Sequence, residues 1–423
     1  MSEALQAPRG TRDLLPAETA RWAAVEAVLR DVYARFGYRE LRTPIFEHTE
    51  LYVRGIGEAT DIVGKEMYTF SDRGGRSLTL RPEGTAGVVR SYVEHSLGQG
   101  DRGEAKLFYL GPMFRYERPQ KGRYRQFWQA GAEAIGYADP AADAESIAML
   151  VLALRELGLK GLQADVNSVG DAETRADFRG RLQDFVRAWG GSISNESRAR
   201  LETNPLRILD SKDPDDAELV AAAPKVTNHL STRSSAHFAG VLRHLDRLGV
   251  PYEVNKKLVR GLDYYSDTVF EVLSSDLGAQ SAVAGGGRYD GLVGQFQKQA
   301  RPAVGWAIGL DRLTVLLEQA GLVAGHGGSQ VAVCTLGGAA FGPGLALAQS
   351  LREAGVSVWF DSSGQRGLKN QFKQADAEGC ALALVLGEDE LARGEASLKD
   401  MKKGEQSPVA LDAVVAEVKR RLN

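Results

Sequence analysis

The segment Phe114-Arg-Tyr-Glu-Arg-Pro-Gln-Lys-Gly-Arg-Tyr-Arg-Gln-Phe-Trp-Gln129 is the part of the chain richest in side chains that can carry chemistry. Its basic residues are Arg115, Arg118, Lys121, Arg123 and Arg125. Pro119 and Gly122 predict a turn in its middle, and the strand-like stretches 106–110 and 126–135 flank that turn. The segment is therefore predicted to be a β-hairpin with a basic loop.

A basic hairpin loop can bind phosphates, because arginine has a fixed charge and offers two parallel donors to one phosphate. The interleaved aromatic residues Tyr124, Phe127 and Trp128 could stack on bases. The opposing interpretation is a solvated, charged hairpin that binds nothing. Composition alone favours neither.

Upstream of the hairpin, the sequence predicts an amphipathic helix that begins at Pro16 and stops at Gly37. Its apolar face comprises Trp22, Val25, Leu29, Val32, Tyr33 and Phe36. A strand-like stretch, 38–43, follows the helix. A second strand, 77–80, precedes the loop Arg81-Pro-Glu-Gly-Thr85.

Three further segments combine glycines with polar or aromatic side chains. Leu258-Val-Arg-Gly-Leu-Asp-Tyr-Tyr-Ser266 could line a small polar pocket with a cation and two phenols, or could be a structural turn. The glycines of Ala284-Gly-Gly-Gly-Arg-Tyr-Asp-Gly291 allow close approach of a ligand, or only a tight turn. Val304-Gly-Trp-Ala-Ile-Gly-Leu-Asp-Arg312 predicts a strand that runs into a helix, with Arg312 in its first turn.

Changes of pattern along the chain predict the domain organisation. Residues 1–325 form the first domain, and 171–250, charged and helical in pattern, is an insertion within it. Residues 321–330 are glycine-rich and predict a linker. In 331–423, the apolar stretches 331–336, 356–360 and 381–386 alternate with helical runs. This alternation predicts an α/β domain whose parallel or mixed sheet is covered on both faces.

Composition narrows the class of protein. The 423 residues include 52 basic and 55 acidic side chains, which excludes a chain that is basic overall but not a local nucleic-acid site. Two cysteines, Cys334 and Cys380, and six scattered histidines show no zinc-ligand spacing, so we expect no tightly bound metal and a reducing cytoplasm. No apolar run reaches the length of about 18 residues that spans a membrane. The first residues lack a signal-peptide core.

Taken in order, these segments resemble the class II aminoacyl-tRNA synthetases, and most closely the histidyl-tRNA synthetase family. The helix at Pro16 with its following strand resembles motif 1, the hairpin motif 2, and 305–312 motif 3. Arg260-Gly-Leu-Asp-Tyr-Tyr265 and Gly285-Gly-Gly-Arg-Tyr-Asp-Gly291 resemble the two signatures specific for histidine. The likeness extends from Pro8-Arg-Gly-Thr-Arg-Asp13 to Gly367-Leu-Lys-Asn-Gln-Phe-Lys-Gln-Ala-Asp376, nearly the whole chain.

The resemblance implies an α+β catalytic domain, in which helices flank an antiparallel sheet, with a helical insertion and a C-terminal α/β anticodon-binding domain. It implies that histidine is activated with ATP and Mg²⁺ to histidyl-adenylate and is then transferred to the 3′ end of tRNA(His). The implied partners are L-histidine, ATP, tRNA(His) and a second copy of the chain, which pairs largely through motif 1. No membrane partner is implied.

The resemblance also assigns roles to individual residues. The catalytic arginines are Arg115 and Arg260. The ATP site comprises Arg115 at the α-phosphate, Arg312 at the γ-phosphate, Phe127 and Glu117 at the adenine, and Arg123. The histidine site comprises Glu83, Gly84, Thr85, Arg115, Gln129, Glu133, Arg260, Tyr264, Tyr265 and Tyr289. Trp128 departs from the family, in which histidine is common at this position, and we interpret it as a packing residue.

Two other interpretations compete with an active synthetase. One is the synthetase-like, histidine-sensing regulatory subunit of ATP phosphoribosyltransferase, which typically lacks the C-terminal domain and the arginine signature. The other is an RNA-binding module without catalysis. The presence of Arg260 and of 331–423 argues against the first, and the set Glu83, Arg115, Arg260 and Arg312 argues against the second.

Overall fold

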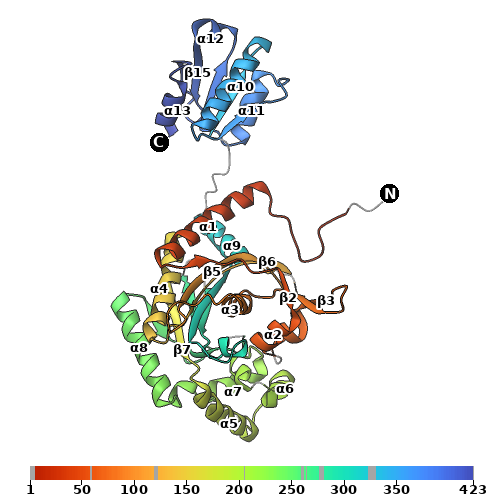
Figure 1. Cartoon of the computed structure of the whole chain (residues 1–423), viewed down its shortest axis with the longest axis vertical. Helices are drawn as coiled ribbons and strands as arrows, with labels where there is room; N and C mark the ends of the chain where they lie inside the picture. Colours follow the sequence, from red (N-terminus) through yellow and green to blue (C-terminus); the bar gives the residue numbers. More distant parts are fainter. Residues whose placement is uncertain are drawn as a thin grey trace. The chain divides into compact units, whose positions relative to one another are not determined.

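The computed structural model describes residues 5–57, 60–118, 122–203, 205–258, 262, 264–275, 281–322 and 330–422 (Figure 1). The chain divides into two compact units, Met1–Ala324 and Gly325–Asn423, and each is described by itself. None of the helices in the described residues is long and apolar enough to cross a membrane.

An eight-stranded sheet organises the first unit, in the order β1-β5-β6-β11-β10-β9-β7-β8. Its strands are β1 (Arg39–Glu40), β5 (Ala105–Phe114), β6 (Gln126–Ile135), β7 (Leu162–Ser168), β8 (Tyr252–Val254), β9 (Ser266–Ser274), β10 (Ser281–Arg288) and β11 (Ala303–Gly309). The six central strands are antiparallel, whereas the edge pairs β1–β5 and β7–β8 are parallel. The predicted antiparallel sheet is thus confirmed at its centre, and parallel edges make it mixed.

Helices α1 (Pro16–Arg35), α4 (Pro140–Glu156) and α9 (Leu310–Gln319) pack together over one face of this sheet (Figure 1). The prediction for α1 is confirmed: Pro16 is its first residue, and its stripe of buried side chains includes Trp22 and Tyr33. Gly37, just past the end, has φ +78°, a conformation that costs glycine little.

The opposite face of the sheet carries α3 (Thr85–Glu94) and the polar side chains of interest. Residues alternate between the two faces along β6. Ala130, Ala132 and Ala134 enter the core beneath α1 and α4, so Gln129 and Glu133 point the other way. The register of one strand therefore brings both predicted β6 site residues to the same side.

The stretch predicted as a strand over 38–43 is wrong in extent, because β1 contains only two residues. The buried Arg81 guanidinium donates to Thr43 O at 2.9 Å and to Thr43 Oγ1 at 3.1 Å, which turns the chain away from β5. The chain then enters a small sheet of β2 (Phe46–His48), β4 (Ser77–Leu80) and β3 (Tyr68–Ser71). Helix α2 (Thr49–Ile56) and the π-helix η1 (Ile62–Glu66) follow β2.

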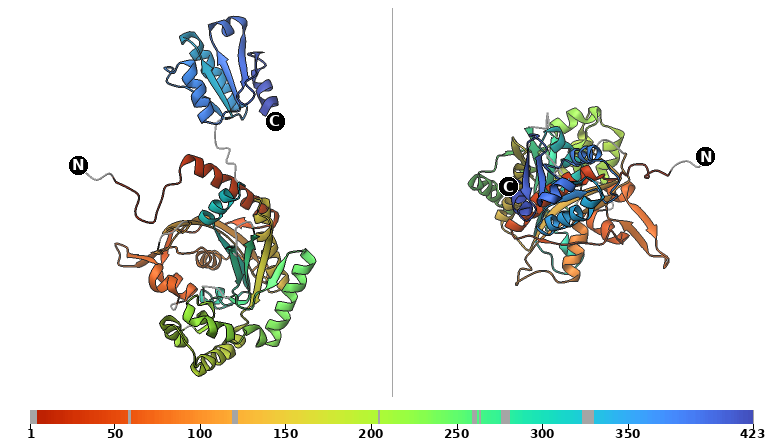
Figure 2. Two further views of the ribbon diagram at one scale, coloured as in Figure 1. Left: turned by 180° about the vertical axis from the view of Figure 1, so that it is seen from behind. Right: turned by 90° about the horizontal axis from the view of Figure 1, so that it is seen from above.

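A helical unit lies between β7 and β8 and has its own apolar core around Phe178, Leu182 and Ile208. Its elements are α5 (Ala172–Ala188), α6 (Asn195–Thr203), η2 (Pro205–Asp210), η3 (Pro214–Asp216), α7 (Ala217–Ala222), η4 (Val226–Asn228) and α8 (Thr232–Leu248). Figures 1 and 2 show it in olive and green beside the β7 end of the sheet. Pro205 and Pro214 begin new short helices, as proline favours at a first helical position.

The second unit contains a mixed five-stranded sheet in the order β13-β12-β14-β15-β16. Its strands are β12 (Val331–Thr335), β13 (Val358–Phe360), β14 (Leu382–Leu386), β15 (Glu395–Asp400) and β16 (Gln406–Ala410), and its helices are α10 (Gly338–Glu353), α11 (Leu368–Ala377), α12 (Glu388–Arg393) and α13 (Val414–Leu422). Apolar clusters lie on both faces of the sheet, as predicted. Strands β15 and β16 were missed, because they carry polar side chains and no apolar run.

Candidate active site

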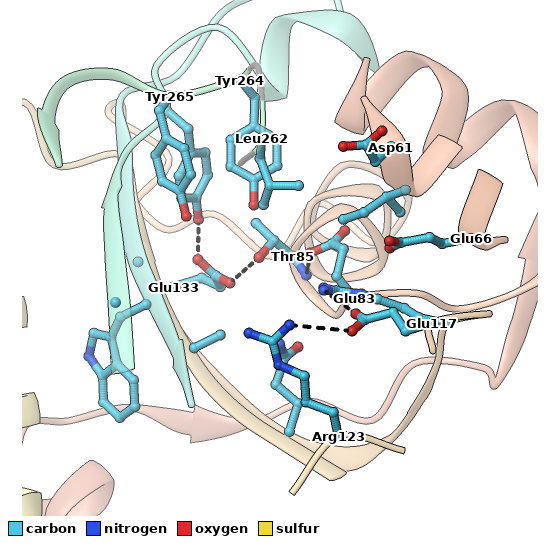
Figure 3. A pocket seen from close by; sticks show the side chains of 18 of the residues that line it. Asp61, Glu66, Glu83, Thr85, Glu117, Arg123, Glu133, Leu262, Tyr264 and Tyr265 are labelled. Carbon is cyan, nitrogen blue, oxygen red and sulfur yellow. Dashed lines mark hydrogen bonds and ion pairs between the residues drawn. The ribbon is translucent and has the colours of Figure 1, made fainter. Parts of the chain in front are cut away.

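A polar cavity of about 520 Å³ lies on the α3 side of the eight-stranded sheet (Figure 3). It gathers side chains from η1, α3, the β5–β6 hairpin, β10, β11 and the segment before β9. Ten residues predicted from the sequence line it: Glu83, Thr85, Arg115, Glu117, Arg123, Gln129, Glu133, Tyr264, Tyr265 and Tyr289. Segments more than 200 residues apart in the chain thus converge on one cavity.

Glu133 occupies the buried floor of the cavity. Its carboxyl group accepts hydrogen bonds from Thr85 Oγ1 at 2.7 Å and from the Tyr289 hydroxyl at 2.5 Å. Burial raises the pKa of Glu133 to about 8, although both hydrogen bonds oppose the rise. Burial thus favours the protonated form of this carboxyl group, and a cationic ligand would favour its ionised form.

Glu83 sits at the amino end of α3. Its carboxylate accepts hydrogen bonds from the backbone N–H groups of Thr85, at 2.6 Å, and of Ala86, at 2.8 Å. A carboxylate at this end of a helix meets unpaired N–H groups and the positive end of the helix dipole. Burial nevertheless raises the pKa of Glu83 above its ordinary value. Arg81, at the start of the loop 81–85, links this loop to β5 by donating to Pro112 O at 2.8 Å.

Three tyrosines form one wall of the cavity. The ring centroid of Tyr264 lies 4.8 Å from that of Tyr265 and 5.6 Å from that of Tyr289. Glycines leave room for this wall: a Cβ on Gly287 would lie 2.8 Å from the Tyr265 ring, and one on Gly305 would lie 1.8 Å from Glu133 Oε2. The glycine run of the second signature thus has a steric explanation, as does the first glycine of the motif 3 segment.

Arginines from the hairpin lie at the mouth of the cavity. Arg115 donates to Pro82 O at 2.8 Å and has its guanidinium 5.3 Å from the centre of the Phe127 ring. Glu117 lies between two arginines, 3.7 Å from Arg115 and 4.0 Å from Arg123. The hairpin itself is confirmed, since β5 and β6 pair from Ala105 with Ile135 as far as Phe114 with Gln126, the pair next to the loop. Pro119 and Lys121, predicted in its turn, lie outside the described residues.

Arg312 lies in the first turn of α9, as predicted, and beside the hairpin: a Cβ on Gly122 would lie 3.8 Å from its Cα. Burial lowers the pKa of Arg312, and the nearby charge of Arg123 lowers it further. Two guanidinium groups held near each other, one of them partly buried, favour an anion between them. Arg312, Phe127 and Gly84 flank the cavity without lining it. Arg260 lies outside the described residues.

The neighbour of Arg312, Asp311, ties three segments together. Its carboxylate accepts from the backbone N–H of Trp128 at 2.7 Å and from Arg12 at 3.3 Å. Trp128 packs edge-on against Trp22, with 6.0 Å between the ring centroids, which agrees with its interpretation as a packing residue. These contacts hold β6 and α9 in a fixed relation behind the cavity.

The sequence reasoning missed several lining residues, among them Asp61, Glu66, Arg207 and Trp306. Arg207 belongs to the helical unit, and Arg200 of the same unit lies 3.5 Å from Asp61. It also missed Tyr109, whose hydroxyl donates to Gln129 Oε1 at 3.1 Å beneath the cavity. No local pattern marks these residues, except the inward position of Tyr109 on β5.

The cavity has two chemically different regions, one with buried carboxyl groups and one with guanidinium groups. Its described lining includes five carboxyl groups and three guanidinium groups. The carboxyl groups of Glu83 and Glu133 are buried with the tyrosines, which suits a small ligand that is cationic and rich in hydrogen bonds. Two of the three guanidinium groups, those of Arg115 and Arg123, belong to the hairpin, which suits phosphates. Within the described residues, no group of three or more histidine, cysteine, aspartate or glutamate side chains is arranged to hold a metal ion.

Comparison with known proteins agrees with this geometry. The family model "Histidyl-tRNA synthetase" matches residues 10–313, and the model "Anticodon binding domain" matches residues 330–421. The histidine–tRNA ligase of Synechococcus elongatus is 54% identical over 410 residues, which cover 95% of this chain and 92% of that protein. That of Geobacillus sp. (strain WCH70) is 47% identical over 99% of this chain and 100% of its own length.

A solved structure is similar over its whole length. The crystal structure of apo S. aureus histidyl-tRNA synthetase matches with a TM-score of 0.81 and 36% identity, over 98% of this chain and 100% of that one. Family model, sequence relatives and fold agree over nearly every residue, and we conclude that this chain belongs to the histidyl-tRNA synthetase family.

Proposed function

We propose that this chain is a histidine–tRNA ligase that activates L-histidine with ATP and transfers the histidyl group to the 3′ end of tRNA(His). The observation that carries the proposal is the cavity, in which a buried Glu83–Thr85–Glu133–Tyr289 cluster adjoins the arginines of the hairpin. An amino acid bound at the buried cluster would lie next to a nucleoside triphosphate bound at the arginines. Relatives named histidine–tRNA ligase support the same activity.

The buried end of the cavity is proposed to bind histidine. Glu83, Gly84 and Thr85 would receive the α-amino group, and Gln129, Glu133 and the three tyrosines would receive the carboxylate and the imidazole. A site built to form hydrogen bonds with its ligand rejects apolar ligands of the same shape, because the buried polar groups would then be unpaired. This polarity selects against apolar amino acids of similar shape.

The open end is proposed to bind ATP with Mg²⁺, which would arrive on the phosphates. Arg115 would hold the α-phosphate, Arg312 the γ-phosphate, Phe127 and Glu117 the adenine, and Arg123 would add charge nearby. In the first step a carboxylate oxygen of histidine bonds to the α-phosphorus and pyrophosphate leaves. Fixed guanidinium groups stabilise the negative charge as it shifts in the transition state. Arg260, by resemblance, would serve the carboxylate and the α-phosphate.

Exchange of labelled pyrophosphate into ATP tests this proposal directly. We expect exchange that requires histidine and Mg²⁺, with all other amino acids far weaker. The regulatory-subunit alternative predicts histidine binding without exchange, and the RNA-binding module predicts neither. Equal exchange with a second amino acid would refute the proposed specificity, and absence of histidine-dependent exchange would refute the proposed activity.

Histidine binding is expected to release a proton from Glu133. Its pKa is raised by burial to about 8, and a bound ammonium or imidazole N–H would favour the carboxylate. Affinity is therefore lost as the pH falls below this value, and the Kd for histidine should decrease about fivefold from pH 7 to pH 8. Calorimetry in two buffers of different ionisation enthalpy measures the released proton.

Glu133→Gln is the control for this prediction, because the amide keeps the shape of the side chain and cannot titrate. The variant should bind histidine more weakly but with no proton release and a flat dependence on pH over this range. Proton release that persists in Glu133→Gln would assign the titration to another group.

We further propose that two copies of the chain pair through the motif 1 segment and the adjoining small β2-β4-β3 sheet. Phe46 and Phe70 are 53% and 44% exposed, and their ring centroids are 6.4 Å apart. With the exposed Ile45 they form an apolar patch next to the motif 1 segment, and such patches typically mark an interaction surface. The double variant Phe46→Glu, Phe70→Glu should sediment as a monomer.

Leu345→Glu is a matched control for the dimer, since Leu345 is an equally exposed apolar residue of the second unit. It should leave the sedimentation coefficient unchanged. A double variant that remains dimeric would place the interface elsewhere.

We propose a cytoplasmic location, where tRNA is charged; the free buried cysteines, Cys334 and Cys380, are consistent with a reducing compartment.

A further inference from the structure

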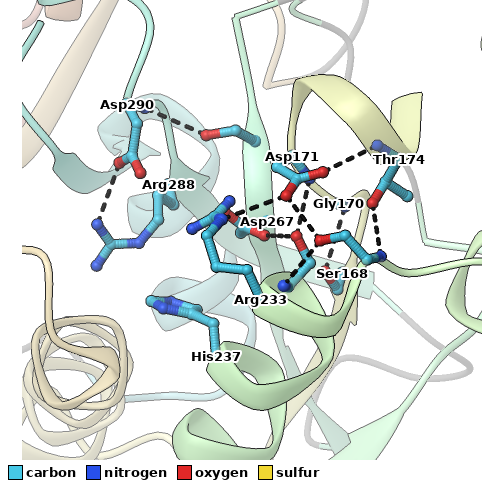
Figure 4. Close-up of polar contacts among 12 residues, drawn as sticks. Ser168, Gly170, Asp171, Thr174, Arg233, His237, Asp267, Arg288 and Asp290 are labelled. Atoms are coloured by element: carbon cyan, nitrogen blue, oxygen red, sulfur yellow. Dashed lines mark hydrogen bonds and ion pairs between the residues drawn. The ribbon is translucent and has the colours of Figure 1, made fainter. Parts of the chain in front are cut away.

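Helix α8 of the helical unit contacts the segment that carries Tyr264 and Tyr265 directly, and it reaches the segment of Tyr289 through Asp143 of α4 (Figure 4). Arg233 and His237 are one turn apart and therefore lie on the same face of α8. Arg233 Nη2 donates to Asp267 Oδ2 at 2.6 Å, two residues after Tyr265. His237 Nε2 lies 3.4 Å from the carboxylate of Asp143, which also binds Arg288, the residue before Tyr289.

Asp267 has a strained backbone and a buried carboxylate. Its φ is +48°, which is uncommon for a residue other than glycine, and only 1% of its surface is exposed. It lies in a bulge of β9: Val269 pairs with Gly287 and Ser266 pairs with Arg288, so Asp267 and Thr268 have no partner in β10. A bulge redirects the side chains next to it. Here those side chains include Tyr264 and Tyr265.

The strained conformation is stabilised from the helical unit. Besides Arg233, Ser234 Oγ donates to Asp267 Oδ1 at 2.5 Å. From α5, Arg175 Nη1 donates to the backbone carbonyl of Tyr265 at 2.9 Å. Strained residues persist where the surroundings over-determine them, and they concentrate at functional sites. The segment Tyr265–Asp267 thus owes its position to two helices outside the sheet.

Asp171 connects the N-termini of α5 and α8. It caps α5 by accepting from Thr174 N at 2.9 Å, and it accepts from Ser231 Oγ at 2.7 Å, just before α8. Arg233 Nε also donates to Asp171, at 3.2 Å, so one guanidinium group bridges Asp171 and Asp267. The helical unit therefore docks on the sheet through a connected set of charges and not through apolar contact alone.

A second branch reaches the third tyrosine. Asp143 and Arg288 are fully buried and paired, and Arg288 Nη1 also donates to Asp290 at 3.1 Å. The backbone N–H of Asp290 donates to Ser266 Oγ at 3.2 Å, which connects this branch to the bulge. Between Arg288 and Asp290 stands Tyr289, whose hydroxyl donates to Glu133.

We infer that Asp267 is a positioning residue for the amino-acid substrate: through α8 and α5 it holds the tyrosine wall in its binding conformation, so that histidine affinity depends on the docking of the helical unit. The inference rests on the proposed function for the identity of the substrate. It concerns a residue that does not line the cavity and that the family resemblance did not single out.

Asp267→Asn tests the inference, because asparagine keeps the shape and tolerates a positive φ but removes the charge that pairs with Arg233. We expect the Kd and KM for histidine to rise about tenfold, the size expected for loss of a buried charged hydrogen bond. The KM for ATP and kcat should change less than about twofold, since the hairpin arginines are untouched. Arg233 and Arg175 are both partly exposed, so methionine can replace either of them. Arg233→Met and Arg175→Met should also raise the KM for histidine.

Asp216→Asn is the matched control. Asp216 is also buried in the helical unit and accepts from Ser194, Ser197 and Ser211, but none of these residues lines the cavity. It should lower the stability of the helical unit without a selective effect on histidine. The inference is overturned if Asp216→Asn raises the histidine KM as much as Asp267→Asn, or if Arg233→Met and Asp267→Asn leave that KM unchanged.

Amide hydrogen exchange separates failure of the inference from failure of the proposed function. Asp267→Asn or Arg233→Met should speed exchange in residues 264–270 and 286–290, whereas Asp216→Asn should speed it only around 194–216. This measurement needs no activity, so it stands even if the unmodified protein does not activate histidine. Unchanged exchange at 264–270 in Arg233→Met would refute the positioning role.

Discussion

A chain that ends at Gly325 is expected to form histidyl-adenylate at the full-length rate and to charge tRNA(His) about 10²–10⁴-fold less efficiently. The residues proposed to bind histidine and ATP all precede Gly325, the last of them being Arg312. The unit Gly325–Asn423, which matches an anticodon-binding family model, is compact and has its own core. Its loss removes one of two linked contacts with a large RNA and with it the gain in effective concentration.

The measurement pairs pyrophosphate exchange with a charging assay on a tRNA(His) transcript. Circular dichroism and sedimentation must first show that the truncated chain is folded and keeps the oligomeric state of the full chain. Supplying residues 325–423 as a separate polypeptide should not restore charging, because the linkage is what provides the gain. If a folded truncation in the oligomeric state of the full chain charged tRNA as well as the full chain, the second unit would not be needed for charging.

Arg115→Ala is expected to slow histidyl-adenylate formation by about 10²–10³-fold, as for loss of a preorganised electrostatic stabiliser. Its guanidinium is fixed by the bond to Pro82 O and by the Phe127 ring, so little reorganisation is needed when charge develops. The KM values should move much less than kcat, because the charge acts mainly in the transition state. By resemblance, Arg260→Ala should have an effect of similar size.

Arg125→Ala is the matched control for this variant. Arg125 belongs to the same hairpin, but its guanidinium lies 3.9 Å from the centre of the Tyr116 ring and outside the cavity lining. It should change kcat less than about threefold, the range of an ordinary surface substitution. If Arg115→Ala kept a near-normal kcat and lost only affinity for histidine, Arg115 would be a binding group and not a catalytic one.

The parts of the site that could be predicted from sequence share a local pattern. Gln129 and Glu133 lie on one strand with period two, and the hairpin around Arg115 is marked by its own turn residues. Asp61, Arg207 and Asp267 could not be found in this way, since tertiary packing alone brings them to the cavity or to its support. The residues next to them in the sequence show no periodicity that would mark a site.

The same distinction applies to the fold. Helix α1 follows from its apolar stripe and its proline and glycine boundaries, which are local signals. The early end of β1 depends on Arg81, nearly 40 residues downstream, whose guanidinium bonds to Thr43. The parallel pairing at the sheet edges likewise depends on where long connections return, and the composition of a two-residue or three-residue strand does not encode it.

Tyr109 has a consequence for how this cavity can vary among related proteins. Its ring fills the space that a side chain at Gly84 or Gly131 would occupy. A Cβ on Gly84 would lie 2.2 Å from the ring, and a Cβ on Gly131 would lie 2.4 Å from it. A substitution at either glycine is therefore blocked while the phenol remains. A smaller residue at Tyr109 would free that volume for both. The three positions are therefore expected to change together. A homologue with alanine in place of Gly84 or Gly131 should carry a smaller residue in place of Tyr109.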